Sequence, residues 1–172
     1  MTELRFYTFV NFYLSSIQQG VQSFHVLHEM MLKYPYDEDV ASGELPEAKR
    51  FYDWAKNHKT VILLNGGAHD DIRDIELFFK EHAGELSFPA PFAAFYEDDK
   101  SLNGMMTAVA IVLPKEIYDA VDYRKVNLPG GPGEIDKLRF FFVNEDGSFV
   151  IYEPETIEHE LIKLLKSCSL AR

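Results

Sequence analysis

The first part of the chain combines an apolar run with a helical repeat. Residues 4–14 are almost continuously aromatic or β-branched, which is typical of a strand buried on both faces. The serines after this run fit a capping box with the glutamines three positions later, so we expect a helix to begin there and to end before Pro35. The apolar positions of this helix recur at helical spacing: Ile17, Val21, Phe24, Leu27 or His28, and Met31.

The middle of the chain continues this alternation of strands and helices. Helical periodicity indicates helices over residues 48–58, 71–84 and 114–125. Short apolar runs bounded by glycine, proline or acidic turns indicate strands over residues 59–65, 88–96 and 107–114. Because helices alternate with buried strands, we expect an α/β fold with a mixed four-stranded sheet and helices on both of its faces.

The end of the chain has a different pattern, because a break rich in proline and glycine at residues 128–134 precedes it. Two strand-like runs flank Asp146-Gly147, a dipeptide that is a strong signal for a β-hairpin, and an amphipathic helix follows. We therefore expect an α/β domain at residues 1–126. The C-terminal hairpin and helix, residues 127–172, form an extension that packs on the same domain.

The composition indicates a soluble, cytoplasmic protein. With 172 residues, of which 47% are hydrophobic, the chain is long enough for one well-packed domain. Cys168 is the only cysteine, which excludes an internal disulfide and indicates a reducing compartment. We find no signal peptide and no apolar run that approaches the roughly 20 residues of a membrane span. The formal net charge of -11 repels polyanions and favours partners other than nucleic acid.

Three stretches of the chain stand in an order that one known family shows. They are GVQSFH, which includes Gln22 and His25, then YDWAKNHKTVILLN, which includes Trp54, and finally AAFYEDDKSLNGMMTAVAIVLP. In this order they resemble the first helix, the tryptophan and second strand, and the acidic turn between the third and fourth strands of the type-two peptidyl-tRNA hydrolases of archaea and eukaryotes. The resemblance spans residues 4–125. It implies that four strands form one mixed sheet, which places the start of the first helix next to the acidic turn.

The resemblance also implies candidate site residues. The family's catalytic lysine falls on Gln18, and its glutamine and histidine fall on Gln22 and His25, to which we assign ligand binding. Its aspartate and threonine fall on Glu97 and Ser101; the alignment there needs a gap, which makes the next acidic residue an alternative to Glu97. The catalytic residues that the resemblance implies are Glu97, Asp98, Ser101 and Gln18.

The missing lysine guides the functional hypotheses. Gln18 in its place removes a cation that holds phosphate or stabilises developing charge, a loss that commonly costs about 100-fold or more in rate. The leading hypothesis is a peptidyl-tRNA-hydrolase-like protein that has lost the ancestral activity and binds a partner protein or a small ligand, without a cofactor. The alternative is an active hydrolase that cleaves the peptidyl ester with a rearranged Glu/Asp–Ser site. We also expect that the C-terminal extension completes the sheet or forms the face of a homodimer.

Two histidines three residues apart give a third hypothesis. His25 and His28 lean to one side of the helix and could bind a metal together with Glu29 or Asp70, as in a small metal-dependent enzyme. The chain has no H-E-x-x-H motif, and its sequence does not specify a third protein ligand. The other interpretation places His25 in helix packing and His28 near solvent, and on that interpretation we expect no metal site.

Overall fold

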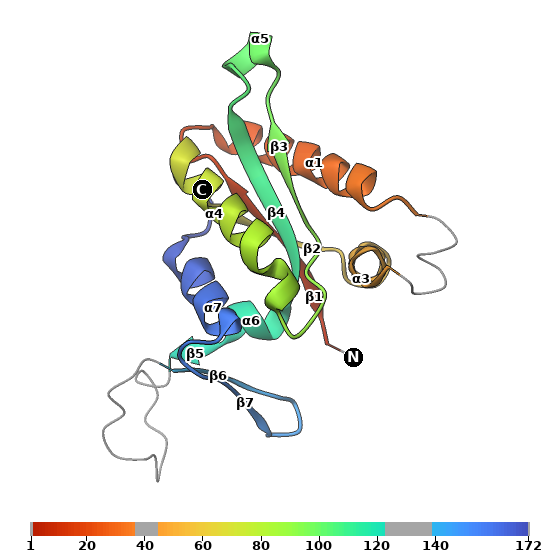
Figure 1. Ribbon diagram of the computed structural model, residues 1–172, viewed down its shortest axis with the longest axis vertical. Coiled ribbons are helices and arrows are strands. Elements are labelled where there is room, and N and C mark those ends of the chain that lie inside the picture. Colours follow the sequence, from red (N-terminus) through yellow and green to blue (C-terminus); the bar gives the residue numbers. More distant parts are fainter. Residues whose placement is uncertain (1, 37–44, 123–138, 172) are drawn as a thin grey trace. The chain divides into compact units, whose positions relative to one another are not determined.

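The computed structural model describes residues 2–36, 45–122 and 139–171 (Figure 1). None of the helices in this part of the chain is long and apolar enough to span a bilayer.

The described residues belong to two compact units. Unit 1 is Met1–Leu113 together with Cys168–Arg172, and unit 2 is Pro114–Ser167. The domain boundary that we predict between residues 126 and 127 lies outside the described residues.

Unit 1 is built on a mixed four-stranded sheet with the strand order β2-β1-β4-β3. Parallel pairing joins β1 to β2, antiparallel pairing joins β3 to β4, and the N–H of Asn11 after β1 donates to the Thr107 carbonyl at the start of β4. The predicted mixed sheet is therefore confirmed. The strands are β1 (Leu4–Val10), β2 (Thr60–Asn65), β3 (Phe92–Tyr96) and β4 (Met106–Pro114).

Helices cover both faces of this sheet, as predicted (Figure 1). Side chains alternate between the two faces along a strand, so neighbouring positions of β1 meet different helices. Phe6 stacks on Trp54 with ring centroids 4.7 Å apart, whereas Phe9 meets Phe79 of the helix on the other face at 5.8 Å. The helical segments of unit 1 are α1 (Ser16–Lys33), α3 (Pro46–Asp53), η1 (Trp54–His58), α4 (His69–His82), η2 (Ala83–Glu85) and α5 (Asp99–Leu102).

The last residues of the chain lie along the outer edge of β2. The N–H of Asn65 donates to the carbonyl of Ser169 at 2.8 Å, and the N–H of Ala171 donates to the carbonyl of Leu63 at 3.0 Å. An unpaired edge strand offers its backbone to other chains. The returning segment pairs part of that edge.

The first helix begins where the sequence predicts, but its apolar face does not pack on the sheet. Ser15 caps α1 and forms the expected capping box with Gln18. The buried positions of the helix are Gln19, Gln22, Ser23, Val26 and Met30. The apolar repeat lies on the opposite side, where the exposed residues are Ile17, Val21, Phe24, Met31 and Leu32.

The described residues of unit 2, 114–122 and 139–167, form a small antiparallel sheet with the order β5-β6-β7 and two helices. The predicted hairpin is confirmed, with a left-handed backbone at Gly147 (φ +83°) and a hydrogen bond from the Ser148 N–H to Asp146 Oδ1. The helix predicted over residues 114–125 is shorter, because the chain pairs with β6 directly after it. The elements are α6 (Lys115–Asp119), β5 (Val121–Asp122), β6 (Phe140–Val143), β7 (Phe149–Tyr152) and α7 (Ile157–Ser167).

Candidate functional site

The first helix meets the acidic turn through a chain of side-chain hydrogen bonds. Thr107 Oγ1 at the start of β4 donates to Gln22 Oε1 at 2.8 Å. Gln22 Nε2 in turn donates to Glu97 Oε1 at 2.7 Å. The predicted juxtaposition of the helix start and the turn after β3 is therefore present. Two of the predicted site residues, Gln22 and Glu97, touch each other directly.

Burial makes this chain of hydrogen bonds a rigid part of the unit. Thr107 is 1% exposed and Gln22 is 8% exposed, while Glu97 is partly exposed. A buried amide without partners would cost about 1–3 kcal/mol, so the Gln22 amide, which uses both ends, is fixed in one orientation. The same orientation holds one oxygen of the Glu97 carboxylate against the helix. The arrangement places a carboxylate at the protein surface in a defined position.

The polar character of the buried helix face continues on both sides of Gln22. Ser23 Oγ donates to Thr8 Oγ1 of β1 at 3.3 Å, and Gln19 Nε2 donates to the carbonyl of Leu14 at 3.1 Å. Each of the buried polar side chains of α1 thus has a hydrogen-bond partner. These partners explain how a polar helix face can be buried at little cost.

Asp98 and Ser101 form hydrogen bonds within the acidic turn, whereas Glu97 contacts the first helix. Asp98 caps the short helix α5, because its Oδ1 accepts from the Lys100 N–H at 2.6 Å. The backbone N–H of Ser101 donates to the carbonyl of Asp98 at 2.9 Å, and both residues are exposed. The Glu97 carboxylate contacts Gln22, not Ser101. The geometry therefore assigns Asp98 to the turn and gives Glu97 the position facing the helix.

Gln18, which stands in the place of the family's lysine, is engaged at the end of its own helix. Its Oε1 accepts from the Ser15 N–H at 3.0 Å and from Ser15 Oγ at 2.9 Å. Gln18 therefore acts as the second half of the capping box. It is exposed and supplies no cation to the surface beside Glu97.

The two histidines of α1 have different surroundings. His25 stacks on Phe95 of β3 with ring centroids 4.6 Å apart and an interplanar angle of 12°. His28 is exposed. Among residues 2–36, 45–122 and 139–171, no group of three or more His, Cys, Asp or Glu side chains could hold a metal ion.

Thr107 anchors this series of hydrogen bonds, although it is not among the site residues that the sequence predicts. One signal was available, because Thr107 is the polar residue that opens an otherwise apolar strand, TAVAIVLP. The strand is buried along its whole length, so a hydroxyl at its start needs a partner. His69 is a second neighbour that the patterns missed, with Nδ1 3.5 Å from the carbonyl of Met106.

A second polar cluster lies where α4 meets β3. Tyr96 Oη donates to Glu76 Oε2 at 2.7 Å, and Lys80 Nζ lies 2.9 Å from Glu76 Oε1. Burial raises the pKa of Tyr96 to about 12, with added contributions from the hydrogen bond to Glu76 and from its charge. Burial also lowers the pKa of Lys33, whose Nζ donates to the carbonyl of Phe92 at 2.9 Å. A pocket of about 200 Å³ lies among these groups, lined by Glu29, Lys33, Glu76, Lys80, Phe92, Ala93 and Ala94.

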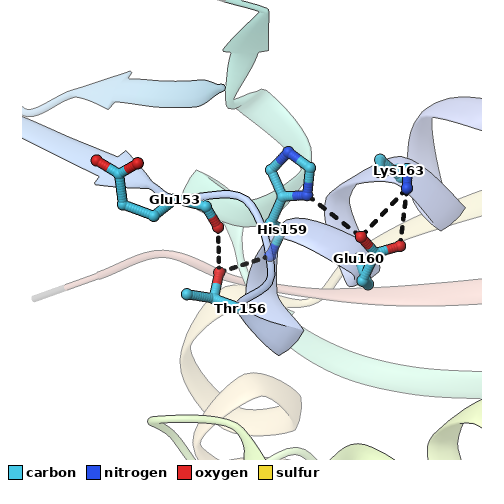
Figure 2. Close-up of polar contacts among 5 residues, drawn as sticks. All are labelled: Glu153, Thr156, His159, Glu160 and Lys163. Atoms are coloured by element: carbon cyan, nitrogen blue, oxygen red, sulfur yellow. Dashed lines mark hydrogen bonds and ion pairs between the residues drawn. The ribbon is translucent and has the colours of Figure 1, made fainter. Parts of the chain in front are cut away.

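The polar cluster of unit 2 supports the start of α7 (Figure 2). Thr156 Oγ1 donates to the carbonyl of Glu153 at 2.8 Å and accepts from the His159 N–H at 3.3 Å, as a helix cap does. Lys163 lies 2.9 Å from Glu160 on the same helix, and its hydrogen bond lowers the pKa of the Glu160 carboxyl. These contacts explain the order of this turn without invoking a ligand.

Comparisons with known proteins add no assignment to this geometry. The chain matches no protein-family model, and no curated protein matches it.

Proposed function

We propose that this protein is a binding domain on a peptidyl-tRNA-hydrolase-like fold, and that it binds a partner protein through the exposed face of α1. The observation that carries the proposal is the orientation of this helix. Ile17 is 82% exposed and Phe24 is 68% exposed, while three polar residues of the helix, Gln19, Gln22 and Ser23, are buried. Contiguous apolar surface on a folded protein commonly marks an interaction site. We call the exposed residues Ile17, Val21, Phe24, Met31 and Leu32 the outer face of α1.

The charge of this surface favours a protein partner over tRNA. A surface that grips a phosphate backbone needs clustered lysine and arginine side chains. Between Ser16 and Leu32 the only charged residue is Glu29, and the whole chain has a net charge of -11. The outer face of α1 therefore offers apolar contact without the cations that RNA binding requires.

The state of the candidate catalytic residues supports the loss of hydrolysis. Gln18 and Asp98 act as caps for helices, and Glu97 is held by Gln22. Because Gln18 is uncharged, charge that develops on the carbonyl oxygen during ester cleavage lacks the cation that the resemblance assigns to this position. These roles favour a structural use of residues that the resemblance assigns to catalysis.

One observation favours hydrolysis as the second candidate function. The partly exposed Glu97 is fixed within hydrogen-bonding reach of Gln22, so its carboxylate could orient a water molecule. An N-acetylated aminoacyl-tRNA is a direct probe. We expect no cleavage above the uncatalysed rate. Cleavage that disappears in Glu97→Gln and persists in Glu145→Gln, an exposed acidic residue of the hairpin turn, would replace the binding proposal with this one.

Photo-crosslinking from the outer face of α1 tests the binding proposal. Benzoylphenylalanine replaces Phe24 in one variant and Leu77 in a matched control, since Leu77 is also exposed (41%) but lies on α4. In cells that make the protein, the Phe24 position should give a discrete adduct that mass spectrometry identifies, and the Leu77 position should not. Absence of any adduct at Phe24, or the same adducts from both positions, would contradict the proposal.

A further inference from the structure

The exposed apolar positions of α1 have the spacing of a coiled-coil seam. Ile17, Val21, Phe24 and Met31 share one stripe with the exposed histidine at position 28, and these five positions are separated by four, three, four and three residues. This alternation keeps one stripe of a helix facing a second helix over several turns. We propose that the partner is a second copy of this chain and that the two α1 helices pack along this seam. The inference rests on the proposed function, because it uses the same surface.

The seam has the symmetry that such a pair requires. Phe24 lies seven residues from Ile17 and seven from Met31, so it marks the middle of the seam. In a two-fold dimer each residue on the axis meets its own equivalent. In a parallel pair the axis runs along the seam and each seam residue, including Phe24, meets its equivalent, whereas in an antiparallel pair an axis at Phe24 brings the two Phe24 rings together. In the antiparallel case Ile17 of one copy also meets Met31 of the other.

Charge argues for a second copy over a basic partner. Two chains with a net charge of -11 repel each other, so they can associate closely only where carboxylates are absent. The outer face of α1 has no acidic side chain, and Glu29 lies off the seam and is half-buried. A basic partner would be expected to bind where carboxylates offer complementary charge, and this face has none. The outer face of α1 therefore allows two copies of this acidic chain to associate without bringing their carboxylates together.

The area of the face is sufficient for a weak to moderate dimer. Exposed fractions in the outer face range from 47% at Val21 to 82% at Ile17. At roughly 200 Å² for a large, fully exposed side chain, the face presents on the order of 600 Å² of apolar surface per copy. Stable interfaces bury about 600–1,000 Å² per partner, so the helix reaches the lower end of that range when all five side chains of the outer face are covered.

Gly20 gives a second copy room to approach. A Cβ at this position would have no neighbouring atom within 4 Å, so the space outside the helix backbone there is open. Gly20 is four residues before Phe24 and therefore lies on the same side of the helix. A flat site beside the largest side chain of the seam is where a partner's ring can be accommodated.

Sedimentation of the full-length protein tests the inference. We expect a reversible dimer with a dissociation constant between about 1 and 100 µM, at the weak end of the affinities that interfaces of standard size show. Phe24→Asp should weaken the dimer by about 30-fold or more, as the loss of a central side chain does. Ile17→Asp provides a second variant, and Leu77→Asp on α4 is the matched control that should leave the dimer unchanged. A monomer at about 100 µM, or a dimer that both outer-face variants leave intact, would overturn the inference.

Disulfide trapping locates the axis and separates this inference from the proposed function. In a Cys168→Ser background, Phe24→Cys should give a covalent dimer under mild oxidation, and Leu77→Cys should not. If Phe24→Cys gives no covalent dimer while photo-crosslinking from Phe24 captures a different protein, the inference that the partner is a second copy is wrong and the proposed function stands. If neither experiment yields an adduct from Phe24, both are wrong.

Discussion

The two faces of α1 reverse the usual distribution of side chains. The face that packs on the sheet includes Gln19, Gln22 and Ser23, whereas the face in solvent carries Ile17 and Phe24. Val26 and Met30 anchor the inner face in the core, and its polar groups are tolerated there because each finds a specific partner. The outer face has no such explanation within the described residues of unit 1. A helix with this arrangement fits a protein that completes its apolar packing with a partner.

The comparison is sharpest at two adjacent methionines. Met30 is fully buried in the core below the helix, while Met31 is 51% exposed on the outer face. Met30→Ala should lower the free energy of unfolding by about 2–5 kcal/mol, because it leaves a cavity in the core. Met31→Ala should change it by less than about 0.5 kcal/mol. Urea denaturation of dilute protein measures both values, and equal losses would show that the assignment of the faces is wrong.

The hydrogen-bond chain below the helix should have the next largest effect. Thr107→Val keeps the shape of the side chain but removes the donor to Gln22 Oε1, so we expect a loss of about 1–3 kcal/mol. Ser101→Ala is the matched control, since its side chain is exposed in the turn and should matter little. Chemical denaturation provides the measurement. If Thr107→Val leaves the free energy of unfolding unchanged, the hydrogen bond from Thr107 to Gln22 does not stabilise the inner face of α1.

Glycines on the two sides of the unit should respond to alanine with opposite signs. Gly20→Ala adds a Cβ into open space within a helix, so we expect dilute protein to gain about 0.5–1 kcal/mol. Gly66→Ala places a Cβ 2.9 Å from Ile72 Cγ1 and 3.0 Å from Phe9 Cβ, so it should destabilise. Thermal unfolding of both variants checks the prediction. A loss of stability in Gly20→Ala would indicate that this part of the helix is covered.

The smallest predicted effect concerns Tyr96 at the end of β3. Its pKa is raised to about 12, first by burial and then by the hydrogen bond to Glu76 and by its charge. The neutral phenol is therefore favoured in the folded state. Its contribution to stability is complete below the ordinary tyrosine pKa near 10 and is lost as the pH rises towards about 12.

Absorbance of the ionised phenol gives the test. Tyr96→Phe should remove one of the late-titrating groups, and Glu76→Gln should shift the same transition to lower pH. Glu81→Gln is the control, because Glu81 is an exposed residue on the same helix. An unchanged titration in Glu76→Gln would show that the Glu76–Tyr96 contact is not formed.

Local patterns were sufficient to predict most of the secondary structure. The capping box at Ser15 and Gln18 and the hairpin at Asp146-Gly147 follow from short-range rules, and both are present. The mixed sheet follows from the alternation of buried strands with helices. Long-range pairing set the limits, because the helix after β4 ends where Val121 pairs with Phe141. The pattern of residues 114–125 could not predict this end of the helix, because Phe141 lies outside that range.

The choice between the two faces of α1 shows why part of the candidate site could not be predicted. Helical spacing defines two faces, but it does not say which one is buried. Gln22 can be buried because Glu97 and Thr107 satisfy its amide. These partners lie 75 and 85 residues away in the sequence, so no local pattern predicts them. The resemblance predicted that the start of the helix lies next to the acidic turn, but it did not predict that Gln22 contacts Glu97. The capping box had already assigned Gln18 to the start of the helix, whereas the capping role of Asp98 became visible only from the geometry.

Thiol labelling tests the central claim, that α1 turns its apolar face outward, most directly. In a Cys168→Ser background, Phe24→Cys and Val26→Cys place a thiol on the outer and the inner face, at positions 68% and 0% exposed. In dilute native protein, the account predicts that the thiol of Phe24→Cys reacts at least about a hundredfold faster, because the other must wait for an opening of the fold. Equal rates, or faster labelling of Val26→Cys, would contradict the account.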